Sequence, residues 1–178
     1  MELFDLYDEN RIKTGETMVR GTPEPSGFYR MVVHICIFGD DGKMLIQRRQ
    51  DNKHGWSGMW DFTVGGSAVT GDSSRQAAVR EVREEIGIDI SGDGLRRVLT
   101  VQTENVFDDI YTVNKNVDMS DIILQAEEVA EVKWADIGEI FSMIDDGRFI
   151  PYHKSLVELL FFMRNNDGAR TGQDKTER

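Results

Sequence analysis

Residues 65–88 read GGSAVTGDSSRQAAVREVREEIGI. In the second half of this stretch, apolar side chains recur at about the 3.6-residue period of a helix. Asp72 and Ser73 are suitable N-cap residues, and Gly87 stands where a C-terminal cap is expected. We therefore expect a helix over residues 72–86 that begins after a glycine-rich loop.

Three carboxylates gather on one face of this expected helix. With about 100° of rotation per residue, Glu81, Glu84 and Glu85 share that face. Ala77 lies among them and should leave room above them for a diphosphate. Like charges at these spacings disfavour an isolated helix by roughly 0.2–0.5 kcal/mol per pair, so a cation is expected to neutralise them. The arc that should pack on the core consists of Ala78, Val79, Val82 and Ile86.

The glycines before the helix indicate what else could reach such a cation. Gly65 and Gly66 permit a positive φ and a close approach, so a backbone carbonyl or N–H could reach the same metal and a phosphate. Oxygen ligands without clustered His or Cys favour Mg²⁺ or Mn²⁺, which bind through a few carboxylates and substrate phosphate oxygens. The alternative is a solvated acidic face without a ligand, which is the common outcome for a Glu-rich helix.

The same residues resemble a known family signature. Gly66, Asp72 and the run from Arg80 to Ile88 are similar to the Nudix box, Gly-x5-Glu-x7-Arg-Glu-U-x-Glu-Glu-x-Gly-U, where U is aliphatic. Asp72 is the one departure, because the family usually has Glu there. The Asp72 carboxylate has one methylene less reach, so capping the helix or supporting other side chains suits it better than direct ligation of a metal.

The resemblance implies a role for each charged residue of the box. Glu81 and Glu85 would ligate Mg²⁺ or Mn²⁺, and Glu84 would be a further ligand or the base that orients water. The backbone of Gly65 would add a ligand to the metal site. Arg80 would position a neighbouring carboxylate, whereas a mere surface pair with Glu84 would contribute only about 0.3–0.5 kcal/mol. We therefore assign Glu84, Arg80 and Glu81 to catalysis.

A cationic and aromatic segment precedes the box. Arg48, Arg49 and Lys53 close an expected strand and begin the loop that contains Trp56. Cations beside aromatic rings could hold a phosphate and stack a base or another ring, although these cations could equally be solvated. Trp60, further along, is expected to belong to the core.

Several residues outside the box carry reactive groups. A general base from outside the box is common in the family that the chain resembles. Its candidates are Asp108, Asp109, Glu127 and Glu128. His34 lies in an apolar strand and is expected to be a core residue with a hydrogen-bond partner. Cys36, the single cysteine, is expected to be a buried thiol without a catalytic role.

The pattern around the box indicates a mixed sheet between helices. The order of strands, helix, strands and helices predicts an α+β protein with an α-β-α sandwich, and the resemblance implies the Nudix fold. A hairpin is expected in the first twenty residues, and the next two strands should pair antiparallel across the turn at residues 39–42. The expected strands of the main sheet cover residues 29–38, 44–48, 95–102, 110–113 and 129–134, and the closing helices cover residues 135–145 and 152–164.

Three parts are expected along the chain. Residues 1–26 should form an N-terminal β-hairpin extension and a Pro- and Gly-rich linker. Residues 27–165 should form the Nudix hydrolase domain. Residues 166–178 are polar and should form a mobile tail.

The composition favours a protein that binds a small ligand. The chain has 178 residues and a formal net charge of −11, which disfavours binding to nucleic acid. No apolar run is long enough to cross a membrane, and the N-terminus lacks the pattern of a signal peptide, so we expect a cytoplasmic protein without membrane contact. The expected partner is a phosphorylated small molecule. The sequence leaves the oligomeric state open, with a homodimer as one option.

These features together predict a Mg²⁺- or Mn²⁺-dependent hydrolase. Water would attack a phosphorus atom in a diphosphate that links a nucleoside or another alcohol to a second group. One alternative is an enzyme like the isopentenyl diphosphate isomerases, because the N-terminal hairpin and the segment Gln47-Arg48-Arg49 resemble that branch. Gly65 stands where those enzymes need a cysteine, which disfavours the alternative. A second alternative is a catalytically silent nucleotide-binding module, but such a module would not need three mutually repelling carboxylates.

Overall fold

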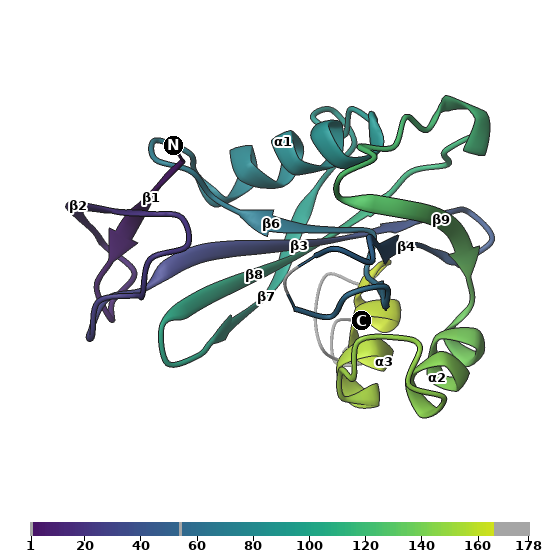
Figure 1. The fold of residues 1–178 in the computed structure, drawn as a ribbon. Helices are drawn as coiled ribbons and strands as arrows, with labels where there is room; N and C mark the ends of the chain where they lie inside the picture. The colour runs from purple at the N-terminus through teal and green to yellow at the C-terminus, as the bar shows by residue number, and fades with distance from the viewer. Residues whose placement is uncertain (1, 54, 166–178) are drawn as a thin grey trace, which may run out of the picture.

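The computed structural model describes residues 2–53 and 55–165. A mixed sheet lies between helix α1 on one side and helices α2 and α3 on the other, and a two-stranded hairpin extends from one end (Figure 1). This arrangement confirms the predicted α-β-α sandwich. The elements are β1 (Leu3–Tyr7), β2 (Lys13–Val19), β3 (Arg30–Phe38), β4 (Met44–Arg49), β5 (Trp60–Asp61), β6 (Val64–Ser67), α1 (Ser74–Ile86), β7 (Arg96–Gln102), β8 (Val106–Asn114), the 3-10 helix η1 (Met119–Asp121), β9 (Val129–Ala135), α2 (Ile137–Asp145) and α3 (Lys154–Met163).

Strand β3 is the centre of the main sheet. The strands follow the order β5-β4-β3-β8-β7, and in addition β6 pairs with β3 and β9 pairs with β4. β3 and β4 are antiparallel, with Ile37 opposite Leu45, as the turn between them predicts. β3 and β8 are parallel, with Ile35 opposite Tyr111. The parallel pair brings strands from before and after α1 together at the middle of the sheet.

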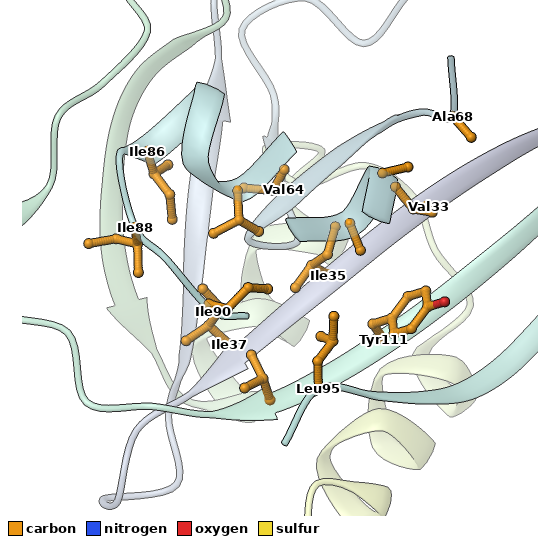
Figure 2. Packing of buried hydrophobic residues seen from close by; sticks show 14 of the residues in the cluster. Val33, Ile35, Ile37, Val64, Ala68, Ile86, Ile88, Ile90, Leu95 and Tyr111 are labelled. Carbon is orange, nitrogen blue, oxygen red and sulfur yellow. The ribbon is translucent and has the colours of Figure 1, made fainter. Parts of the chain in front are cut away.

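The two faces of β3 build two separate cores. Because successive side chains of a strand point to opposite faces, Val33, Ile35 and Ile37 pack under α1, as Figure 2 shows. Cys36 and Phe38 belong to the core on the side of α2 and α3. Cys36 is fully buried, as predicted for a structural thiol. Trp60 lies in the same core, which confirms that prediction as well.

The N-terminal hairpin has a small core of its own and is joined to the main body. Strands β1 and β2 are antiparallel, and they bury Phe4, Leu6 and Met18 between them and the loops that they touch. Backbone hydrogen bonds in both directions connect Tyr7 and Tyr29, with N to O distances of 2.8 and 2.9 Å. These hydrogen bonds attach the hairpin to the residue that precedes β3.

The segment before α1 differs from the expected glycine loop. Gly65 and Gly66 lie in strand β6 and pair with β3, and neither has a positive φ. The prediction of a loop was wrong. Two adjacent glycines indicate a flexible backbone, but pairing with β3 holds these two in an extended strand. The helix begins at Ser74 instead of residue 72, because Ser73 is its cap.

Ala77 also differs from its expected place. It is fully buried in the core under α1, so it leaves no space for a diphosphate. The buried face of α1 is wider than the helical periodicity predicted, because the helix lies against both β3 and β6. The two closing helices begin later than predicted, after Asp136 and His153, which act as their caps.

The predicted mobile tail, residues 166–178, lies outside the described residues. Among the helices in the described part of the chain, none is long and apolar enough to cross a membrane.

Candidate active site

Helix α1 has well-defined ends, which fix the direction of its acidic face. The Ser73 hydroxyl accepts a hydrogen bond from the backbone N–H of Gln76, and the Gln76 side chain accepts one from the backbone N–H of Ser73. This reciprocal arrangement is a capping box. Gly87 ends the helix with a φ of 75°, a conformation that glycine adopts without a steric cost.

Glu81 lies directly against strand β6. A β-carbon placed on Gly66 would lie 2.2 Å from the carboxyl carbon of Glu81, so any larger residue at position 66 would force the Glu81 side chain to move. The close approach that the two glycines predicted is therefore present, although a positive φ is not its cause. Burial raises the pKa of Glu81, and the neighbouring charge of Arg80 opposes that shift.

Glu85 is the most buried carboxylate of the helix, with 6% of its surface exposed. Its side chain accepts a hydrogen bond of 3.0 Å from Nε2 of Gln47 on strand β4. Burial raises the pKa of Glu85 to about 8, and the neutral Gln47 amide opposes this only in part. A buried carboxylate with so little compensation is stabilised in its charged form by a nearby cation.

Arg80 connects the acidic residues of the box. Its Nε and Nη2 both donate to the same Oδ2 of Asp72 at 3.1 Å, and Nη2 also donates to the Ser67 carbonyl at 3.0 Å. Its Nη1 donates to Glu81 and Glu84, at 3.0 Å each. A guanidinium has five N–H donors, so these contacts occupy all of them. Arg80 therefore connects several acidic residues, and its contact with Glu84 is one of five hydrogen bonds.

The three predicted metal-binding carboxylates meet at one small cavity of about 160 Å³. Oxygen atoms of this kind suit a hard divalent cation. Among the described residues, no three acidic, His or Cys side chains lie already arranged around a single point. Arg80 instead holds Glu81 and Glu84, so binding a cation requires these side chains to turn toward it. The cavity is lined by Glu2, Arg20, Ser67, Arg80, Glu81, Glu84, Glu85, Gln125 and Glu128.

The structure separates the four acids proposed as a base outside the box. Glu128 lines the cavity of the box carboxylates and pairs with Lys53. Glu127 lines a neighbouring cavity instead. Asp109 is completely buried, where Arg11 and other donors bind it. Glu128 is thus the one of the four that shares a cavity with Glu81, Glu84 and Glu85.

Asp108, the fourth acid, belongs to another site. Its Oδ1 lies 2.8 Å from Nδ1 of His34, so the expected partner of this histidine is present. Burial alone would lower the pKa of His34, but the hydrogen bond and charge of Asp108 outweigh it and raise the pKa. His34 also lies against Gly65, where a β-carbon would lie 2.9 Å from the imidazole Cδ2. His34 is therefore partly exposed at a cavity instead of enclosed in the core.

A larger cavity of about 890 Å³ adjoins the acidic one. Arg20 and Ser67 line both cavities. Arg49 and Lys53, two of the predicted substrate-binding residues, line the larger one. Arg48 is not among its lining residues and pairs with Glu131 and Asp51 instead. Arg20, at the end of the N-terminal hairpin, was not predicted, because nothing in the sequence indicates which later residues the hairpin approaches.

A third cavity, of about 410 Å³, shares Arg49 with the second. Trp56 lines it with half of its surface exposed. Tyr152 also lines it, and its hydroxyl donates a hydrogen bond of 2.9 Å to Asp61. The Tyr152 ring stacks on Phe62 with ring centres 4.4 Å apart. The roles of Asp61 and Tyr152 were missed, because they lie far apart in sequence in segments that carry no motif.

Comparison with known proteins identifies relatives along most of the chain. The model of the NUDIX domain matches residues 28–160. An uncharacterized Nudix hydrolase of Listeria monocytogenes is 42% identical over 165 residues, which cover 93% of this chain and 96% of the relative. An isopentenyl-diphosphate Delta-isomerase of Escherichia coli is 27% identical over 114 residues, which cover 61% of this chain and 63% of that enzyme.

Solved structures show the same fold. The structure of DR0079 from Deinococcus radiodurans superposes with a TM-score of 0.72 and 22% identity, covering 89% of this chain and 97% of that one. The NUDIX domain of Shewanella oneidensis NrtR, in complex with ADP ribose, superposes with a TM-score of 0.55 and 18% identity. That match covers 74% of this chain and 84% of the NrtR chain.

Proposed function

Because this chain belongs to the Nudix family and is a pyrophosphohydrolase of that family, we propose that it hydrolyses a diphosphate linkage in a small molecule with the help of Mg²⁺ or Mn²⁺. The observation that carries the proposal is the meeting of Glu81, Glu84 and Glu85 at one cavity, with Glu85 buried beside a single neutral donor. These carboxylates would hold the cation, together with the backbone carbonyl of Gly65.

The cation would neutralise the charge that develops on the diphosphate and lower the pKa of water. Residues of the chain position the carboxylates and remove the proton from water. Arg80 holds Glu81 and Glu84 beside the cavity through its Nη1, and from there both side chains would turn toward the cation. Glu84 takes the proton from the attacking water, with Glu128 of the same cavity as the alternative base. The new phosphorus–oxygen bond forms as the bridging oxygen leaves with the second phosphate, so the products are two phosphorylated molecules.

The cations beside the acidic cavity support a phosphorylated substrate. The chain carries a net charge of −11, so phosphate groups need local positive charge to approach it. Arg20, Arg49 and Lys53 supply that charge in the larger cavity. Arg20 also reaches the acidic cavity, so it could bind a phosphate next to the metal.

The third cavity supports a substrate that carries a ring beyond its diphosphate. Arg49 lines both this cavity and the larger one, so the two adjoin at that residue. The indole of Trp56 offers an exposed face for stacking, and Tyr152 and Asp61 offer polar atoms. These features support the alcohol part of the substrate lying in this cavity.

Isomerase activity has no support from the residues at the site. Proton transfer to an alkene needs a strong, well-placed acid. Gly65 occupies the position where the resemblance predicts a cysteine, and Cys36, the single cysteine of the sequence, is fully buried in the opposite core. Burial raises the pKa of that thiol well above its usual value.

A substrate screen tests the proposal. Nucleotide sugars, dinucleoside polyphosphates, nucleoside triphosphates, coenzymes and prenyl diphosphates would be incubated with the protein, with and without Mn²⁺, and phosphorylated products measured. We expect cation-dependent hydrolysis of at least one class, and a loss of about a hundredfold or more in Glu85→Gln, because even groups that only support metal ligands contribute 10–100-fold. Glu158→Gln, at an exposed position of α3, is the matched control and should have no effect. Full turnover in Glu85→Gln would contradict the mechanism.

A further inference from the structure

The N-terminal hairpin contacts the loop that leads into α1. The backbone N–H of Thr70 donates to the Leu3 carbonyl at 2.8 Å. The backbone N–H of Gly71 donates to Oδ2 of Asp5 at 3.0 Å. The ammonium of Lys13 donates to the backbone carbonyl of Asp72 at 3.1 Å. Three consecutive residues of the loop are thus held by β1 and β2.

Asp5 and Lys13 act as one unit in these contacts. Their side chains form an ion pair with an Nζ to Oδ2 distance of 2.6 Å. Burial opposes ionisation of Asp5, but the hydrogen bonds from Lys13 and Gly71 outweigh it, so the pKa of Asp5 lies below its usual value. Hydrogen bonds to an ionised acceptor are stronger than neutral ones. The Asp5 carboxylate therefore holds the loop and Lys13 at the same time.

The loop has little means of fixing itself. Gly71 has a φ of 93°, and a β-carbon there would meet nothing within 4 Å. Glycine is the residue with the most backbone freedom, so this position is expected to vary without support from outside. Within the loop, the N–H of Asp72 donates to the Val69 carbonyl at 3.0 Å, which closes a turn but does not orient it on the body of the protein.

The position of Asp72 matters because Arg80 depends on it. A single oxygen of Asp72 accepts both Nε and Nη2 of Arg80. The opposite nitrogen of the same planar guanidinium holds Glu81 and Glu84. A displacement of Asp72 would therefore turn the guanidinium and move both carboxylates. An Asp side chain is one methylene shorter than Glu, so its backbone has to lie closer to Arg80 to make the same contact.

We propose that the N-terminal hairpin is a positioning element of the active site, in which the Asp5 and Lys13 pair holds the loop at residues 70–72 so that the short Asp72 side chain reaches Arg80. The proposal rests on the proposed function, because it concerns the carboxylates that would bind the cation. It assigns a role in metal binding to residues far outside the box. Asp5 and Lys13 are positioning residues, since neither touches the acidic cavity.

Calorimetric titration with Mn²⁺ alone tests this without a substrate. The proteins compared are the wild type, Lys13→Met, Asp72→Glu and the double variant. Loss of a supporting residue behind metal ligands lowers affinity by roughly 10–100-fold, so we expect Lys13→Met to weaken Mn²⁺ binding about tenfold. In the Asp72→Glu background the same substitution should weaken Mn²⁺ binding less than it does in the wild type, because the longer side chain reaches Arg80 from a displaced backbone.

Lys43→Met is the matched control. Lys43 forms an ion pair with Asp41 at 2.9 Å and is 45% exposed, against 44% for Lys13. It lies in the turn between β3 and β4 and should leave Mn²⁺ affinity unchanged. Asp5→Asn is a second variant that should reproduce the effect of Lys13→Met, with thermal unfolding as the check that each protein folds.

Two results would overturn the proposal. One is wild-type Mn²⁺ affinity in both Lys13→Met and Asp5→Asn. The other is an equal loss of affinity from Lys13→Met in the wild-type and Asp72→Glu backgrounds, because that would mean that the hairpin only stabilises the fold. Failure of the proposed function gives a different result, namely Mn²⁺ binding that survives Glu85→Gln.

Discussion

Two buried carboxylates, Asp109 and Glu85, lie under opposite electrostatic conditions. Asp109 on β8 is 0% exposed, and Arg11, Arg97, Ser74 and Thr100 all donate hydrogen bonds to it. Burial opposes its ionisation, but these donors outweigh burial, so the pKa of Asp109 lies below its usual value.

Glu85 is buried to nearly the same degree but has a different set of neighbours. It accepts a hydrogen bond from the neutral amide of Gln47, and burial raises its pKa to about 8. Lys53 and Arg49 lower the pKa only as minor contributions. Cationic side chains donate hydrogen bonds to Asp109, whereas among the described residues the side-chain donor to Glu85 is a neutral amide.

Asp109 has the surroundings of a structural acid, and Glu85 has those expected of a metal ligand. Asp109 ties the turn of the N-terminal hairpin, through Arg11, to Ser74 at the start of α1. Arg11 has a φ of 65°, a conformation that costs about 1–2 kcal/mol in a residue with a β-carbon. The ion pair with Asp109 offsets this cost. Both carboxylates are buried, so the number and charge of their hydrogen-bond donors distinguish them.

The largest expected effect is on Asp109. The substitution Asp109→Asn removes a buried charge that accepts hydrogen bonds from two hydroxyls and from the partly exposed Arg11 and Arg97, so we expect it to lower the free energy of unfolding by roughly 3 kcal/mol or more. Urea denaturation at pH 7 measures this. A loss below about 1 kcal/mol would mean that Asp109 is not the structural anchor that its contacts indicate.

The equivalent substitution at Glu85 should raise the free energy of unfolding instead of lowering it. In metal-free buffer at pH 8, Glu85→Gln replaces a poorly compensated buried carboxyl by a neutral amide of the same size. We expect the free energy of unfolding to rise by about 1–3 kcal/mol, because one pKa unit corresponds to about 1.4 kcal/mol. The same urea experiment applies, with chelator present throughout. Destabilisation of the Glu85→Gln protein would mean that the Glu85 carboxylate is stabilised by its surroundings, as Asp109 is.

The pH dependence of stability separates the two sites further. The pKa of Glu85 is about 8 in the folded protein against an ordinary value of 4.5, so its stabilising contribution is complete below pH 4.5 and is lost as the pH rises to about 8. Asp109 has a lowered pKa, so its contribution is present above its ordinary value of 3.8 and is lost as the pH falls through its folded pKa.

This sign difference gives the smallest effect that is still measurable. Between pH 6 and 7 the metal-free wild type should lose about 1 kcal/mol of stability relative to Glu85→Gln, because the folded protein binds more protons than the unfolded chain over this range. Unfolding by urea at successive pH values measures the difference between the two proteins. Parallel curves for the wild type and Glu85→Gln over this range would show that Glu85 does not titrate as its burial requires.

The sequence predicted those features that depend on local periodicity. The helical face with Glu81 and Glu85, the cap at Ser73 and the antiparallel pair of β3 and β4 all follow from residues close in the chain. The β6 strand was missed because its sequence, Val-Gly-Gly-Ser, has little strand propensity, and its pairing with β3 comes from a segment about thirty residues earlier.

The remainder depends on contacts between distant segments. Asp108 and Asp109 are adjacent and equally acidic, yet one binds His34 and the other binds Arg11, which is 98 residues away in sequence. Glu128 is distinguished from Glu127 by the cavity that it lines. Sequence patterns do not report which of two neighbouring acids a distant cation will meet.

Glu85 stands at the proposed cation site, and calorimetric titration with Mn²⁺ shows whether a cation binds there. Titrations at pH 7 in two buffers of different ionisation enthalpy give both the affinity and the number of protons released. With a pKa of about 8, Glu85 is mostly protonated at this pH, so Mn²⁺ binding should release about one proton, and Glu85→Gln should abolish both binding and release. Binding of Mn²⁺ by Glu85→Gln with unchanged affinity, or binding by the wild type without proton release, would mean that Glu85 does not ligate the cation.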